Sequence, residues 1–143
     1  MVGRDGRGEH GTSTARARHG HGVSGDVGRV ERLAAAVRAQ EGRCVWCGRA
    51  FGALVPATTD HLVPRTKGGP SWPENEVAAC RRCNAERGHT SPADWADECA
   101  RRGWPVDLEL VRTALERLEE AVERRGGARR ARPYLRGQLR RVR

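Results

Sequence analysis

The chain has 143 residues, with 27 Lys or Arg against 18 Asp or Glu, and only six aromatic side chains: four Trp, one Tyr and one Phe. No apolar run approaches the roughly 20 residues that a membrane-spanning helix needs, so this class is excluded and no membrane partner is expected. The length indicates one small domain, and the scarcity of large apolar side chains predicts that something besides packing stabilises it.

The N-terminal residues predict an unstructured beginning followed by a helix. Residues 1–25 mix Gly, His, Arg and Ser without apolar periodicity, which is typical of a disordered arm, and they lack the apolar stretch of a secretory leader. We therefore expect a cytoplasmic, reducing setting without disulfides. Residues 26–42 are expected to form the N-terminal helix, with Asp26 as its N-cap and Gly42 as its stop.

Two further helices are predicted in the second half of the chain. Ser91 and Pro92 provide an N-cap and a proline at the first helical position for a helix that runs to about Arg102. Residues 106–125 hold the longest predicted helix, which begins at Asp107 and carries an apolar seam at spacings of three and four. The seam covers just over two heptads, which is short for a coiled coil, so packing within a monomer is favoured over a dimer.

The formal charge is concentrated at the C-terminal end. Residues 1–123 contain equal numbers of basic and acidic side chains, whereas residues 124–143 contain nine Arg and no acid, and so account for the net charge of +9. A run of this kind is typical of a segment that binds a polyanion, usually nucleic acid. Residues 126–143 are therefore predicted to be a basic tail, with a solubilising disordered end as the alternative.

Four of the five cysteines form two C-x-x-C pairs, Cys44 with Cys47 and Cys80 with Cys83. Each two-residue gap lets two thiolates converge on one ion, so the four cysteines predict a closed, structural Zn²⁺ site. A redox dithiol is the alternative, but two such pairs without a surrounding βαβ pattern favour the metal. Cys99 is predicted to be a small buried side chain rather than a fifth ligand.

Most of the residues capable of other chemistry lie between and just after these pairs. Asp60 begins the sequence D-H-x-V-P-R-x-K-G-G, Asn75 follows, and the second pair continues as C-x-x-C-N-x-x-R-G. The β-branched residues before Asp60 predict a strand, the Gly pair predicts a loop, and residues 79–87 predict a short helix. This combination resembles the HNH endonucleases of the ββα-metal class that carry a four-cysteine zinc site.

The resemblance implies an α+β fold in which a small zinc-stapled ββα-metal core is flanked by N- and C-terminal helices, with disordered tails. Residues 43–105 would form this nuclease domain. Because neighbouring side chains of a regular strand point to opposite faces, we expect either Asp60 or His61 to lie at the end of the strand or on a bend.

The resemblance also implies roles for individual side chains. His61 is expected to be the general base, since an imidazole can take a proton from water near neutral pH, and Asn75 is expected to brace the loop around it. Asp60 and Asn84 are expected to bind a catalytic Mg²⁺ or Mn²⁺, because carboxylate and amide oxygens are hard ligands that suit these ions.

The sequence therefore predicts a metal-dependent endonuclease whose partner is nucleic acid, with double-stranded DNA as the expected form. Arg65 and Lys67 are predicted contacts to the DNA backbone. Arg87 is predicted to be another, because it follows Asn84 by three residues and so shares its helix face. The alternative is a catalytically inactive, zinc-stapled module that binds nucleic acid.

Overall fold

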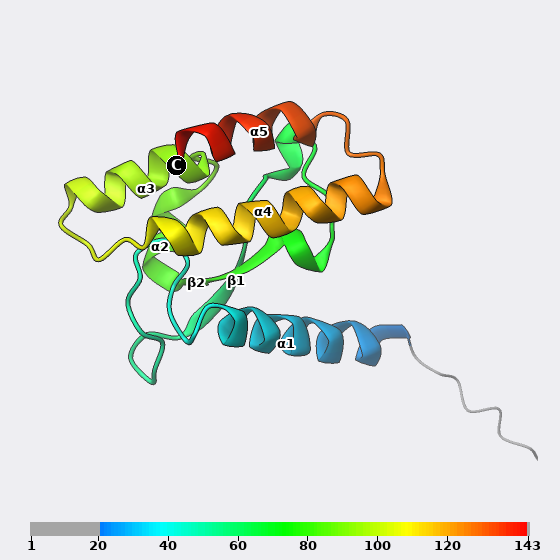
Figure 1. Ribbon diagram of the computed structural model, residues 1–143. Coiled ribbons are helices and arrows are strands. Elements are labelled where there is room, and N and C mark those ends of the chain that lie inside the picture. Colours follow the sequence, from blue (N-terminus) through cyan, green and yellow to red (C-terminus); the bar gives the residue numbers. More distant parts are fainter. Residues whose placement is uncertain (1–20, 143) are drawn as a thin grey trace, which may run out of the picture.

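The computed structural model describes residues 21–142, and side chains from residue 28 onward. Within this range the chain forms five α-helices, two short 3-10 helices and one two-stranded antiparallel sheet, which confirms the predicted α+β class (Figure 1). No helix in the described range is long and apolar enough to cross a membrane. Most of the predicted disordered arm lies outside the described residues, and α1 (His21–Ala39) begins ahead of its predicted start at Asp26.

The sheet consists of β1 (Ala57–His61) and β2 (Glu76–Cys80), which flank the loop after the D-H motif. Ala57 lies opposite Cys80, and His61 lies opposite Glu76. The connection contains η1 (Arg65–Lys67) and η2 (Pro73–Asn75). His61 is the last residue of β1, so the strand ends where the sequence predicted an irregularity.

β2 continues directly into α2 (Arg81–Arg87), which completes the predicted ββα unit. The helix begins at Arg81 rather than at Ala79, because Ala79 pairs with Thr58 in the sheet. Cys80 is its N-cap, and the Cys80 sulfur accepts a hydrogen bond from the Cys83 N–H. The second cysteine pair therefore spans the junction between the strand and the helix.

The side chain of Gln40 joins the end of α1 to the free edge of β2. Its Nε2 donates to the Ala78 carbonyl (2.8 Å) and its Oε1 accepts from the Ala78 N–H (2.9 Å), so that it pairs with the strand much as a third strand would. Gln40 is buried. Together with the Val45 N–H, which also donates to the Ala78 carbonyl (3.1 Å), this contact covers part of the outer sheet edge.

Three helices follow the ββα unit: α3 (Pro92–Arg101), α4 (Leu108–Arg125) and α5 (Ala131–Arg141). The first two begin as the sequence predicts, since the Ser91 hydroxyl caps α3 and the Asp107 carboxylate caps α4. In Figure 1, α1 runs along one side of the sheet, and α4 with α5 lies on the other.

The C-terminal end is not a loose tail, which corrects the predicted disorder there. Ala131, Leu135 and Val142 are buried, and they recur at the spacing of one helical face. Gln138 is also buried, and its Oε1 accepts a hydrogen bond from the Ala93 N–H (2.8 Å) at the start of α3. The apolar stripe of α5 therefore docks this helix on the domain despite its many arginines.

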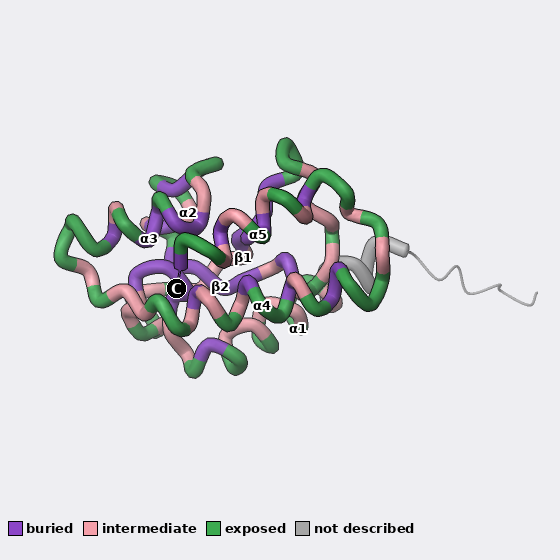
Figure 2. Tube along the Cα trace, turned by 45° about the horizontal axis from the view of Figure 1, so that its top comes forward, coloured by how far each residue is buried: buried purple, intermediate pink, exposed green. Residues whose placement is uncertain are grey.

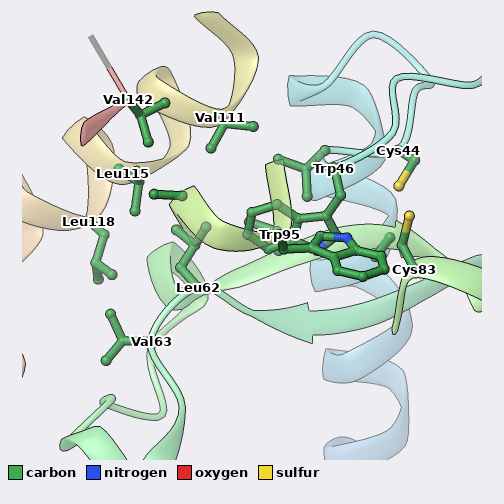
Figure 3. Packing of buried hydrophobic residues seen from close by; sticks show 14 of the residues in the cluster. Cys44, Trp46, Leu62, Val63, Cys83, Trp95, Val111, Leu115, Leu118 and Val142 are labelled. Carbon is green, nitrogen blue, oxygen red and sulfur yellow. The ribbon is translucent and has the colours of Figure 1, made fainter. Parts of the chain in front are cut away.

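The core extends from the cysteine pairs to the helical layer, as the buried segments of Figure 2 show. Trp46 and Trp95 fill the part beside the cysteines. Leu62 and Val63 come directly after His61, and Figure 3 shows them facing Leu115 and Leu118 of α4. The segment that leaves β1 is therefore anchored by apolar packing.

Candidate active site

The four paired cysteines converge on one point. The sulfurs of Cys44, Cys47, Cys80 and Cys83 lie within 4.8 Å of one another, and all four residues are buried. The Cys80 N–H donates to the Cys44 sulfur (3.3 Å), and the Cys83 N–H donates to the Cys80 sulfur (3.5 Å). Backbone donors around converging thiolates make this cluster a site that can hold a metal ion. Cys99 is buried but does not belong to the set.

Hydrogen bonds within this cluster shift the pKa values of its thiols in opposite directions. Hydrogen bonding from Cys44 holds the pKa of Cys47 far below its ordinary value, whereas the same contact raises the pKa of Cys44 to about 12. Hydrogen bonding with Cys44 also raises the pKa of Cys83. A bound dication would allow all four cysteines to be thiolates at once, because its charge stabilises them together.

Asp60 lies in β1 and its carboxylate is held by three N–H donors. Its Oδ2 accepts from Trp46 Nε1 (2.8 Å) and Arg87 Nη1 (3.0 Å), and its Oδ1 accepts from the His61 backbone N–H (2.8 Å). Asp60 is 8% exposed. A carboxylate has about four acceptor positions, so the three donors leave about one for a further ligand.

Arg87, at the end of α2, is only 3% exposed. Besides Asp60, its guanidinium donates to the carbonyls of His61 (2.7 Å) and Leu62 (3.1 Å), and it lies 4.3 Å from the centre of the Trp46 ring. A side chain in this position cannot reach a phosphate, which corrects the predicted DNA contact at Arg87. The three-residue spacing from Asn84 indicated the helix face on which Arg87 lies, but not how deeply its side chain is buried.

His61 and Asn75 define the segment that follows β1. His61 is exposed, and its imidazole leaves the strand from the face opposite to the buried Asp60. Asn75 is fully buried, and its side chain accepts from the Val63 N–H (2.9 Å) and donates to the Val63 carbonyl (3.0 Å). A Cβ on Gly69 would overlap the same carbonyl, so only glycine fits there. These contacts fix the backbone just beyond His61.

Asn84 projects from α2 toward β1. Its Nδ2 donates to Thr58 Oγ1 (3.0 Å) and to the Thr59 carbonyl (2.9 Å), which turns its amide oxygen away from these contacts. Thr58 and Asp60 are two residues apart in the strand and so share one face. The structure thus brings Asp60 and Asn84 to the contact between β1 and α2. Among the described residues, no hydrogen bond joins the His61 imidazole to either side chain.

The other predicted site residues lie on the surface. Arg65 and Lys67 belong to η1 and are both exposed. This position leaves them free to contact a ligand outside the protein.

The sequence matches a known family over this region. The family described as HNH endonuclease matches residues 44–99, which include both cysteine pairs and all of the predicted catalytic side chains. Residues 44–99 are therefore similar to HNH endonucleases, and we refer to them below as the HNH domain.

The relatives of the HNH domain are much longer proteins. The CRISPR-associated endonuclease Cas9 of Corynebacterium diphtheriae is 36% identical over 78 residues, which are 54% of this chain and 7% of that protein. Cas9 of Actinomyces naeslundii is 32% identical over 83 residues, 57% of this chain and 7% of that protein. The crystal structure of the Type II-C Cas9 enzyme from A. naeslundii aligns with 30% identity and a TM-score of 0.46 over 65% of this chain and 10% of that one. The chain therefore spans a small part of its relatives.

One contact within the HNH domain was not predicted from the sequence. Trp46 lies between the first two cysteines and is fully buried. It also donates its indole N–H to Asp60, so the first cysteine pair is linked directly to the predicted metal ligand. The sequence offered only a general indication of this contact, because a buried indole N–H needs an acceptor and Asp60 is a nearby carboxylate.

Proposed function

We propose that this chain is a metal-dependent endonuclease that hydrolyses phosphodiester bonds in DNA. The observation that carries the proposal is the position of Asp60 and Asn84 at the contact between β1 and α2, with an exposed His61 directly after Asp60 at the end of that strand. The family match over residues 44–99 supports the same reaction. The chain covers 7% of its Cas9 relatives, so the proposal concerns this domain and not the activity of those whole proteins.

The donor set suits a divalent ion. Asp60 offers about one unused acceptor position, and the amide oxygen of Asn84 is turned away from its contacts with Thr58 and Thr59. Mg²⁺ or Mn²⁺ held by these hard ligands would supply positive charge to the scissile phosphate and to the leaving oxygen. A single protein carboxylate would leave about half of the ion's charge uncompensated.

The chain's own residues supply the remaining functions. The His61 imidazole is open to solvent, where it can accept a proton from an attacking water. Arg87 holds the His61 carbonyl and the Asp60 carboxylate together, and Asn75 holds the next turn of the chain at Val63. These buried contacts would keep the base and the ligand in a fixed relation, as a catalytic site requires.

We further propose that the four cysteines hold Zn²⁺ in a structural role. Four buried thiolates are a common tetrahedral zinc set, and using all four leaves no open position for substrate. Binding free energies of about 10–16 kcal/mol for such sites would compensate for a core with few large apolar residues.

A catalytically inactive, DNA-binding module is the second candidate. It is favoured by the three N–H donors on Asp60 and by the small exposure of this residue, both of which reduce its availability to an ion. In that case Asp60 would act only as the buried partner of Arg87.

Cleavage of supercoiled plasmid separates the two candidates. Protein containing one zinc per chain is incubated with plasmid with and without Mg²⁺ or Mn²⁺, beside His61→Ala. The endonuclease proposal expects cleavage that requires the ion and falls at least about a hundredfold in His61→Ala. Because His61 is exposed, this variant should fold normally, which its circular dichroism spectrum checks. Binding without cleavage under any of these ions would favour the inactive module, and equal cleavage by His61→Ala would reject His61 as the base.

A further inference from the structure

Two segments without acidic residues carry the positive charge around the HNH domain. Residues 61–73 contain Arg65 and Lys67 and no Asp or Glu, and residues 124–143 contain nine Arg and no acid. The first segment follows directly from the D-H motif, whereas the second lies outside the family match at residues 44–99. These two basic segments are far apart in the sequence, so they can form one basic surface only if the fold brings them together.

The fold brings these segments into contact. The Arg130 guanidinium donates to the Thr66 carbonyl (2.8 Å), and a Cβ added to Gly68 would lie 2.6 Å from the Arg130 Cβ. Gly68 has φ +81°, a left-handed conformation that ends η1. Because it has no side chain, Arg130 and the first residue of α5 can pack against it. We use the name cationic edge for the four exposed cations that make this contact or lie next to it in the sequence: Arg65, Lys67, Arg129 and Arg130.

The cationic edge differs in its surroundings from three other arginines of the C-terminal segment, Arg124, Arg125 and Arg141. Arg125 pairs with Glu74 (3.0 Å), and Arg141 pairs with Asp94 and Asp97. In the part of the chain that the structure describes, no carboxylate lies within ion-pair distance of the cationic edge. Its charge is therefore available to a partner, whereas Arg124, Arg125 and Arg141 are paired within the protein.

We propose that the cationic edge binds the phosphate backbone of duplex DNA and positions the duplex at the HNH domain. The inference rests on the proposed function and extends it, because the turn that leads into α5 would supply DNA contacts that the family-matched segment does not contain. Arg65 follows His61 by four residues, so their Cα atoms are at most about 14 Å apart. A backbone held at the edge would thus pass close to the predicted general base, and such contacts position a duplex without reading its sequence.

The test measures binding in the absence of cleavage. The full chain carrying His61→Ala, loaded with zinc but without other divalent ions, is titrated against a fluorescent 25-base-pair duplex at several salt concentrations. One lost phosphate contact lowers the salt slope by about 0.9, which corresponds to about fivefold weaker binding at 0.15 M salt. Arg65→Ala and Arg129→Ala should each show this change, and the double variant should bind about 30-fold more weakly.

Arg140→Ala is the matched control. It removes the same charge from an exposed position in α5, about 15 Å along the helix from its N-cap Arg130, which exceeds the Debye length of about 8 Å at physiological salt. This variant should bind within about twofold of the unsubstituted protein. Equal weakening by Arg140→Ala and Arg129→Ala, unchanged salt slopes in both edge variants, or no duplex binding by the parent would overturn the inference. Because no cleavage is measured, a failure of the nuclease proposal would leave this result intact.

Discussion

Arg87 carries the most demanding quantitative prediction of this structure. Replacing it with Met retains an apolar stem of similar length over the Trp46 ring but removes the guanidinium. Asp60 would then be a buried carboxylate without its charge partner, and the carbonyls of His61 and Leu62 would lose their donors. Removing one partner of a buried ion pair costs about 3–5 kcal/mol, so Arg87→Met should lower the free energy of unfolding by about 4 kcal/mol.

Urea unfolding followed by circular dichroism, with zinc in excess, measures this loss. Arg87→Lys is the matched comparison, because it keeps the charge but has a single nitrogen that cannot reach Asp60 and both carbonyls together. Its expected cost is about half as large, roughly 2 kcal/mol. A double-mutant cycle with Asp60→Asn should give a coupling energy of about 2 kcal/mol, since neutralising Asp60 removes the unpaired charge.

A loss below about 1 kcal/mol for Arg87→Met, together with coupling near zero, would refute the reasoning. Such a result would mean that the guanidinium is solvated rather than buried. The original prediction of a DNA contact at Arg87 would then be restored.

Three further predictions concern stability. Removing the metal with a strong chelator should abolish cooperative thermal unfolding, and restoring zinc should recover it; an unchanged melting temperature would exclude a structural metal at the four cysteines. Gln40→Leu should cost about 1–3 kcal/mol in urea unfolding, because the N–H and carbonyl of Ala78 lose their side-chain partners, whereas a negligible cost would show that this sheet edge needs no cover. Asp107→Ala should cost about 1 kcal/mol at pH 7 through the lost cap of α4. The Leu110 N–H and then Arg43 hold the pKa of Asp107 below its ordinary value of 3.8, so the stabilisation is present above that pH and is lost as the pH falls through the lowered pKa. The difference between Asp107→Ala and wild type should therefore narrow in acid, and a constant difference would contradict the assignment.

The parts of the fold that the sequence predicted depend on local chemistry. The spacing of the four cysteines, the cap at Ser91 and the cap at Asp107 each follow from residues close together in the chain. The docking of α5 could have been inferred from the spacing of Ala131 and Leu135, but the many charges there outweigh a short apolar stripe.

The contacts around Asp60 were not predictable in the same way. Trp46 and Arg87 reach this carboxylate from positions 14 and 27 residues away along the chain. Helical spacing places Arg87 on a face of α2, yet only the packing of α2 against β1 determines whether that face is exposed. Burial of a charged side chain is a tertiary property, and the single sequence carried no signal for it.

Direct binding of Mn²⁺ to the zinc-loaded protein tests the central claim, that Asp60 and Asn84 form a divalent-ion site. Electron paramagnetic resonance titration should detect one bound Mn²⁺ per chain, and Asn84→Ala should weaken binding at least about tenfold. Thr58→Val is the graded comparison, because it removes one of the two contacts that orient the Asn84 amide but leaves the amide oxygen present, so it should weaken binding less than Asn84→Ala does. Absence of bound Mn²⁺ in the wild type, or equal affinity in Asn84→Ala, would contradict the account.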